Sequence, residues 1–325
     1  MRLEVIALVM LAGSVGAQVR SPVHLYVSNE RSRDVSVIDI ATNKVVARIP
    51  MPARPRGIQA SPDGRKIYVA LSDDAPTLTG TGDGIVAIDV ATRKVSPRMS
   101  AGSDPEQFAV SKDGRTLYAS NEDAGTMSAI DVATGKVRNT AIVGIEPEGV
   151  ALSPDGSMVY VTAETSNSVS VIDAKTNKVV ANMLVDARPR AAAFSPDGRW
   201  AYVTAEIGGT VNVVDTKARE VVATIDLPPG NVKPVGVVVS PDGKTVYTAN
   251  GRTSSVSVID ATSRKLVATI PVGKRPWGII VSADGRYLYT ANGLSHDVSV
   301  VDTGTRKVVG TIKVGTAPWG LAFGR

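Results

Sequence analysis

The decapeptide SPDGRKIYVA at residues 61–70 recurs in close copies that begin at residues 111, 153, 195, 240 and 282. Ser-Pro-Asp-Gly is typical of a tight turn, because proline presets its own φ and glycine accepts a positive φ without a Cβ clash. The residues after the turn are rich in Val, Tyr and Thr, which favour β-strands. The repeat therefore predicts six copies of a turn followed by a strand.

Two further recurring residues, a strand tyrosine and a strand-ending aspartate, each occur seven times, which raises the number of predicted repeats from six to seven. The strand tyrosines are Tyr26, Tyr68, Tyr118, Tyr160, Tyr202, Tyr247 and Tyr289. The aspartates that end a VSVID-like segment are Asp39, Asp89, Asp131, Asp173, Asp215, Asp260 and Asp302. LYVSN at residues 25–29 has the tyrosine strand without a turn before it, and WGLAFGR at residues 319–325 has no tyrosine strand after it. The two ends of the chain are therefore expected to complete one repeat together.

Each unit contains four short strands, which in residues 190–226 are RAAAFS, WAYVT, TVNVVD and EVVATI. A unit of this size cannot bury both of its faces alone, whereas units arranged around an axis bury them against their neighbours. Small residues alternate along the first strand, as strands that converge on an axis require. We predict an all-β fold, a seven-bladed β-propeller of four-stranded antiparallel blades, formed by one domain over residues 18–325 and closed by the C-terminal strand.

Residues 1–17 have the pattern of a secretory signal peptide. Arg2 precedes an apolar stretch at residues 5–12, and small residues lead to Ala17. The apolar stretch is too short to span a bilayer. We expect cleavage near Ala17 and a mature protein that is periplasmic or secreted, with no membrane span.

The composition excludes several kinds of chemistry. The chain has no cysteine, which rules out disulfides, thiol nucleophiles, thiolate metal sites and covalent haem attachment. Its net charge of +5 is dispersed, without the basic grooves and interleaved aromatics of a nucleic-acid-binding protein. It has no G-x-S-x-G elbow, and GTGDG at residues 80–84 fits no phosphate-binding loop. His24 and His296 would form a working pair only if the first and last blades brought them together. We predict no catalytic residue and no cofactor.

The repeat P-x-G…SPDG…YVT(A/N)…VSVID…T-x-K-V resembles that of the bacterial YVTN-type β-propeller family, over essentially the whole mature chain. YVSNERSRDVSVID at residues 26–39 and RPRGIQASPDG at residues 54–64 are most similar to exported seven-repeat propellers associated with PQQ-dependent alcohol catabolism. The resemblance implies the fold and a place beside periplasmic dehydrogenases. It implies no activity, because propellers host many functions.

Antiparallel connectivity places the loops of each blade on two faces. The Ser-Pro-Asp-Gly and Asp-x-x-Thr turns share one face, and the turns after the tyrosine strands share the other with the crossovers between blades. Both interruptions of the repeat fall on this second face. SDDAPTLTGTGDG at residues 72–84 carries eight extra residues, and DLPPGNVKP at residues 226–234 carries three. Loops that depart from a regular scaffold are common places for binding sites.

The same face carries charged residues on both sides of a proline at the start of each first strand. The ligand- or partner-binding residues predicted at this channel mouth are Arg54, Arg56, Glu106, Glu148, Arg188, Arg190, Arg275, Trp277 and Trp319. Arginines can hold a carboxylate or phosphate, and adjacent tryptophans offer an apolar platform. The alternative is that arginines and glutamates of neighbouring blades only pair with each other and close the mouth.

Two functions remain open. The first is a non-catalytic binding or scaffold protein, a monomer accessory to periplasmic quinone-dependent alcohol oxidation, with a periplasmic protein partner or a small anionic ligand. The second is a metal-assisted hydrolase of the propeller lactonase type. The candidate cation ligands for this alternative are Glu106, Glu122, Glu148 and Glu164.

Overall fold

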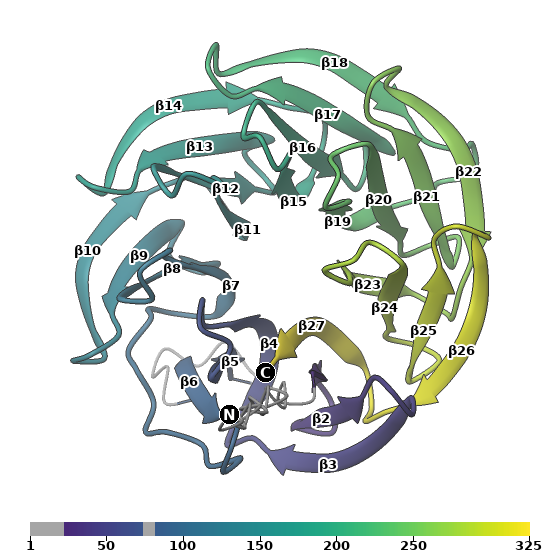
Figure 1. The fold of residues 1–325 in the computed structure, drawn as a ribbon. Coiled ribbons are helices and arrows are strands. Elements are labelled where there is room, and N and C mark those ends of the chain that lie inside the picture. Colours follow the sequence, from purple (N-terminus) through teal and green to yellow (C-terminus); the bar gives the residue numbers. More distant parts are fainter. Residues whose placement is uncertain (1–22, 74–81) are drawn as a thin grey trace, which may run out of the picture.

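The computed structural model describes residues 23–73 and 82–325 and arranges them as seven sheets around a central axis (Figure 1). Blade 1 contains β27 (Pro318–Gly324), β1 (His24–Asn29), β2 (Asp34–Asp39) and β3 (Lys44–Pro50). Blade 2 contains β4 (Arg54–Ala60), β5 (Lys66–Ser72) and β6 (Gly84–Asp89). Blade 3 contains β7 (Pro105–Val110), β8 (Thr116–Asn121), β9 (Thr126–Asp131) and β10 (Lys136–Ile142).

The other four blades repeat this order from the axis outward. Blade 4 contains β11 (Pro147–Leu152), β12 (Met158–Ala163), β13 (Ser168–Asp173) and β14 (Lys178–Leu184). Blade 5 contains β15 (Pro189–Phe194), β16 (Trp200–Ala205), β17 (Thr210–Asp215) and β18 (Glu220–Asp226). Blade 6 contains β19 (Pro234–Val239), β20 (Thr245–Asn250), β21 (Ser255–Asp260) and β22 (Lys265–Pro271). Blade 7 contains β23 (Pro276–Val281), β24 (Tyr287–Asn292), β25 (Asp297–Asp302) and β26 (Lys307–Lys313).

The C-terminal strand closes the ring. β27 pairs antiparallel with β1, with Tyr26 opposite Ala322 and His24 opposite Gly324, so the last strand of the chain is the inner strand of blade 1. Both the predicted ring of seven blades and its closure are confirmed. Blade 2 is less regular, because Pro97 has no N–H to donate and residues 95–99 occupy the fourth position through two isolated bridges only.

The repeated turns are held by their own side chains. In the turn at residues 61–66, the Ser61 hydroxyl donates to Asp63 and accepts from the backbone N–H of Lys66. Gly64 has a φ of 72°, which glycine adopts without strain. On the same face, the Asp89 carboxylate accepts hydrogen bonds from the N–H and hydroxyl of Thr92. These aspartates close hairpins, as the sequence predicts.

The apolar core lies between the blades. The two middle strands of each blade are buried on both faces, whereas outer strands such as β3 alternate between exposed and half-buried residues. Aromatic contacts join neighbouring blades, for example the edge-to-face pair of Tyr68 and Phe108, whose ring centroids lie 6.5 Å apart. At the axis the inner strands approach closely, because a Cβ at Gly278 would lie 2.5 Å from the carbonyl oxygen of Trp319. Glycine is therefore required there.

We call the face that carries the interblade crossovers the mouth face. The long insertion after β5 belongs to it, and its described ends are tied by the Asp83 carboxylate, which accepts from the N–H groups of Asp73 and Asp104 at 2.9 Å. The predicted signal peptide and much of the insertion, including part of GTGDG, lie outside the described residues. Within the described part of the chain, no helix is long and apolar enough to cross a membrane.

Candidate functional site at the channel mouth

The crossovers present their charged residues in a repeated backbone geometry. In six of the blades the residue before the proline that starts the inner strand has a positive φ, for example 61° at Arg188 and 56° at Arg275. Non-glycine residues rarely adopt this region. The conformation recurs at the predicted channel mouth and places the residues on either side of each proline at the same face.

Arg190 is the centre of a buried ionic cluster. Its guanidinium lies 2.5 Å from Glu148 and 2.7 Å from Glu206, and it also bonds Glu164. The side chain of Arg190 is only 8% exposed. Burial alone lowers the pKa of Arg190, but Glu148 and Glu206 outweigh it, so the net change raises this pKa. Burial raises the pKa of Glu206, but Arg190 reverses the shift and the net pKa is lowered.

Pairing across blades therefore joins six of the predicted residues to one another, which are Arg188, Arg190, Glu148, Glu164, Arg56 and Glu106. Arg188 adds a 2.5 Å contact to Glu164, so Glu148 and Glu164 both bond arginine. We weighed these two glutamates as cation ligands together with Glu106 and Glu122. The structure assigns them to Arg190 instead, and they are absent from the group of carboxylates described next.

Three carboxylates converge in blade 3. Asp104 and Glu106 flank Pro105 at the start of β7, and Glu122 follows β8. One oxygen from each lies within 4.8 Å of the others. Glu106 is fully buried, with one oxygen 2.5 Å from Arg56 and the other, Oε1, without a hydrogen-bond partner in the part of the chain that the structure describes. Asp104 was not among our predicted cation ligands, although its place beside Pro105 repeats the pattern that identified Glu106.

The acidic cluster, as we call Asp104, Glu106 and Glu122, fits a hard divalent cation. Burial, followed by the charge of Glu148, raises the pKa of Glu106 well above its usual range, although Arg56 opposes this. Burial and Glu148 also raise the pKa of Glu122, which is half-buried. Carboxylate oxygens are the ligands that Ca²⁺ and Mg²⁺ prefer. A cation would relieve the mutual repulsion and satisfy the unpaired Oε1 of Glu106.

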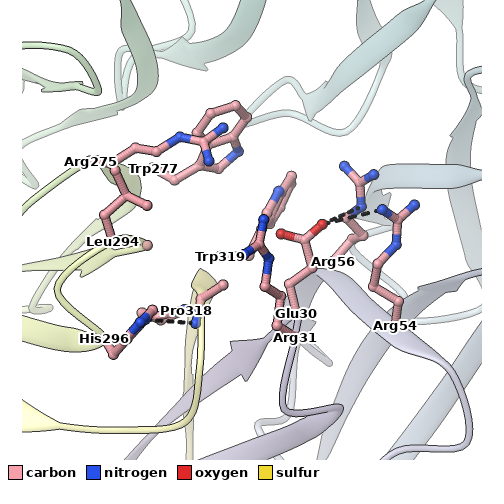
Figure 2. A pocket seen from close by; sticks show the side chains of 12 residues that line it. Glu30, Arg31, Arg54, Arg56, Arg275, Trp277, Leu294, His296, Pro318 and Trp319 are labelled. Atoms are coloured by element: carbon pink, nitrogen blue, oxygen red, sulfur yellow. Dashed lines mark hydrogen bonds and ion pairs between the residues drawn. The ribbon is translucent and has the colours of Figure 1, made fainter. Parts of the chain in front are cut away.

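A cavity of about 460 Å³ opens beside this cluster at the seam between blades 7 and 1 (Figure 2). The predicted residues that line it are Arg54, Arg56, Arg275, Trp277 and Trp319. Glu30 and His296 also line it, and we had not included them in the predicted binding set. Arg54 and Arg56 come from the start of β4, Trp277 from β23 and Trp319 from β27. We call this hollow the seam cavity.

The two tryptophans meet as predicted, with ring centroids 6.3 Å apart. The expectation of an open apolar platform is wrong for Trp277, because the guanidinium groups of Arg275 and Arg190 lie 4.8 and 5.1 Å from its ring centroid. These cation–π contacts cover Trp277 with positive charge. Trp319 is 6% exposed, and its Nε1 has no hydrogen-bond partner.

The two histidines do not meet. His24 begins β1 opposite Asp39, at the face of the Ser-Pro-Asp-Gly turns, whereas His296 lies on the mouth face. The possible working pair is therefore excluded by the direction of β1. His296 accepts a hydrogen bond at Nδ1 from the N–H of Ala317, at 3.1 Å. In the neutral imidazole the proton is then on Nε2, so His296 offers a donor to the cavity.

Two family models match the chain. Residues 15–185 match the choice-of-anchor I domain, and residues 176–313 match lactonases with a seven-bladed β-propeller. No curated protein matches.

Solved structures resemble the whole ring. A candidate 6-phosphogluconolactonase from Bacteroides uniformis has 19% identity and a TM-score of 0.77, covering 93% of this chain and 100% of its own. A protein of unknown function from Desulfotomaculum acetoxidans has 20% identity and a TM-score of 0.77, covering 93% and 99%. Hydrazine synthase from Kuenenia stuttgartiensis has 22% identity and a TM-score of 0.55, covering 77% and 95%. At these identities the likeness shows the fold alone.

Proposed function

Since the chain belongs to the choice-of-anchor I domain family and residues 176–313 also match the lactonase model, we propose that it is a metal-assisted hydrolase of small cyclic esters. Lactone hydrolysis adds water to an ester carbonyl. It requires a group that takes the proton of the water and a positive charge near the carbonyl oxygen. The convergence of Asp104, Glu106 and Glu122 within 4.8 Å, beside Arg56, is the observation that carries this proposal.

Asp104 and Glu106 would hold the cation, and Glu122 would face a water beside it. When bound there, a divalent cation would polarise the ester carbonyl and lower the pKa of a nearby water. Arg56 holds one oxygen of Glu106 at 2.5 Å and so fixes the direction of the unpaired Oε1. Because Glu106 is fully buried, it positions the site and does not reach the bulk solvent.

Glu122 is the general base in this proposal. It is half-buried, so a substrate and a water can approach it, and it belongs to the turn after β8 on the mouth face. Burial and the charge of Glu148 raise its pKa, which brings the carboxylate nearer to the operating pH of a general base. Its role is to accept a proton from water as the ester carbonyl is attacked.

The test is the substitution Glu122→Gln, which keeps the size of the side chain and removes the base. We expect kcat for opening of a susceptible lactone to fall by about 10²–10⁴-fold, the usual contribution of a general base. Asp123→Asn is the matched control, because Asp123 is the exposed neighbour of Glu122 and is not one of the three converging carboxylates. Equal rates for the wild type and Glu122→Gln would contradict the assignment.

Cation binding has a separate readout. Elemental analysis of the purified protein, before and after dialysis against a chelator, measures the bound cation directly. We expect one divalent cation per chain in the wild type and its loss in Glu106→Gln. A wild-type protein that stays free of metal in millimolar calcium and magnesium would remove the cation from the proposal.

A binding or scaffold role is the second candidate, and one observation favours it. Ile142 and Leu184, at the ends of the outer strands of blades 3 and 4, are 83% and 80% exposed. Ile145 and Ile207 are also exposed on the mouth face. In this second proposal, the protein is exported after cleavage near Ala17 and binds a component of quinone-dependent alcohol oxidation. Recovery of a dehydrogenase from periplasmic extract by the wild type, but not by Ile142→Ser with Leu184→Ser, would support it, and equal recovery would contradict it.

A further inference from the structure

The seam cavity contains hydrogen-bond donors that have no acceptor. Nε of Arg54, Nε of Arg56 and Nε1 of Trp319 are buried and have no hydrogen-bond acceptor among the described residues, and all three side chains line this one cavity. A buried donor without an acceptor loses its hydration and gains nothing in return. Such groups are rare in folded proteins and call for an explanation. Three of them around one cavity indicate that its occupant supplies acceptors.

The charge of the cavity indicates that the acceptor is an anion. Four arginines line it against a single glutamate: Arg31, Arg54, Arg56 and Arg275 against Glu30. From outside the lining, Asp104 lies 3.6 Å from Arg54, and Glu106 lies 2.5 Å from Arg56. Within the described residues, no ion pair to a carboxylate is found for Arg31 or Arg275. Positive charge is therefore in excess on the side of the cavity formed by these two residues.

Glu30 shows that the arginine pair accepts a carboxylate. Its Oε1 lies 3.3 Å from Nη1 of Arg54 and 3.7 Å from Nε of Arg56, and in Figure 2 it points to both guanidinium groups. A strong charge-assisted hydrogen bond measures about 2.7–2.9 Å. The contact from Arg54 is a long hydrogen bond, and the contact from Arg56 lies beyond hydrogen-bond distance, so Glu30 leaves Nε of Arg56 without an acceptor. An external carboxylate can compete with it.

We propose that the seam cavity binds the carboxylate of a small organic acid, with Arg54, Arg56 and Nε1 of Trp319 as its donors. The excess positive charge of Arg31 and Arg275 attracts the acid into the cavity, because carboxylates already face the two donor arginines. The volume of about 460 Å³ suits a small molecule, since ligand pockets usually measure about 300–1,000 Å³. Leu294, Pro318 and the indole of Trp319, which also line the cavity, supply apolar surface for the remainder of the acid. This site recognises the negative charge of its ligand. The proposal is therefore independent of whether the acidic cluster hydrolyses a lactone.

The test is calorimetric titration of the purified chain with sodium benzoate, at low ionic strength. Benzamide has the same ring and no charge, and inorganic phosphate tests for a different oxyanion. We expect saturable binding of benzoate, none of benzamide and weaker binding of phosphate. No benzoate binding at millimolar concentrations would overturn the proposal. Phosphate binding as tight as that of benzoate would overturn the assignment to carboxylates.

Two substitutions locate the binding. Trp319→Phe removes the Nε1 donor and keeps an aromatic ring, so benzoate affinity should fall by about tenfold, the usual loss for one hydrogen bond to a charged group. Trp200→Phe, the same change on the opposite face, is the matched control and should leave the affinity unchanged. Unchanged affinity in Trp319→Phe, with an unchanged melting temperature to show that it folds, would refute the site.

Glu30→Gln provides an independent and opposite effect. This change removes the internal competitor and keeps its shape, so benzoate should bind about tenfold more tightly, as expected when a charged competitor is lost. Weaker binding in this variant would contradict the role given to Glu30. Glu122→Gln should retain the wild-type affinity, so that a failure of the hydrolase proposal and a failure of the carboxylate site give different results.

Discussion

A substitution of Arg190 measures how much the buried ion pairs of the mouth face contribute to the free energy of unfolding, because Arg190 contacts three buried carboxylates. Arg190→Met keeps an unbranched apolar stem and removes the guanidinium, which leaves Glu148, Glu164 and Glu206 without their shared partner. These glutamates are 7%, 3% and 7% exposed. Removing one partner from a buried ion pair costs about 3–5 kcal/mol. We expect a decrease of this size in the free energy of unfolding at pH 7.

The decrease should depend on pH in a defined direction. Arg190 helps to lower the pKa of Glu206 below 4.5, so its stabilisation is present above that pH and is lost as the pH falls through the folded-state pKa of Glu206. In Arg190→Met, Glu206 lacks this partner and protonates more readily on acidification, so the deficit relative to wild type should shrink below about pH 4. Urea unfolding at pH 7 and at low pH measures both values.

Arg188→Met is the matched control for this experiment. Arg188 contacts Glu164 and Glu206 as well, but its side chain is 39% exposed. Exposed ion pairs contribute about 0–1 kcal/mol, so this change should cost far less. A loss below about 1 kcal/mol for Arg190→Met at pH 7, well under the cost of breaking a buried pair, would refute the reasoning.

Two further predictions concern pH and stability. In chelator-treated protein, burial raises the pKa of Glu106 above 4.5, so ionised Glu106 destabilises the folded state. The free energy of unfolding of the cation-free wild type should therefore fall relative to Glu106→Gln as pH rises through the folded-state pKa. A constant difference from pH 4 to pH 9 in urea unfolding would refute this. Hydrogen bonds from Ser153 and from the N–H of Ser157 lower the pKa of Asp155 from 3.8 to about 2. Asp155→Asn should therefore melt below the wild type at neutral pH, with a difference that disappears as pH falls through about 2. A difference that persists at lower pH would contradict this cause.

The fold could be predicted almost completely from local chemistry. Each turn is specified within six residues, as Ser61, Asp63 and Gly64 illustrate, and the same turn is repeated in six of the seven blades. Counting seven tyrosine strands against six turns also identified the seam where β27 joins β1. Blade 2 departs from the repeat where Pro97 replaces a donor in the outer strand. That departure was present in the sequence, but its extent depends on pairing that only the structure shows.

The sequence predicted which face of the propeller carries the candidate site, but it predicted the contacts between the side chains of that site less well. Repeat positions placed Trp277 beside Trp319 correctly, because neighbouring blades keep the same register. Repeat positions could not show which carboxylate side chain each arginine pairs with, since this depends on side-chain length and rotamer. Arg190 contacts three glutamates, and the acids that converge in blade 3 include Asp104, which we had not predicted as a cation ligand. The histidine pair failed because strand direction places His24 at the other face.

The hydrolytic role of the acidic cluster is the central claim, and the rate of lactone opening tests it most directly. The measurement is acid release from a panel of five- and six-membered lactones at constant pH, with chelator and then with added calcium or magnesium. We predict turnover by the wild type that depends on the cation, is retained by Asp123→Asn and is lost in Glu122→Gln. Lactone opening that does not exceed the rate in buffer, with either cation present, would contradict the claim.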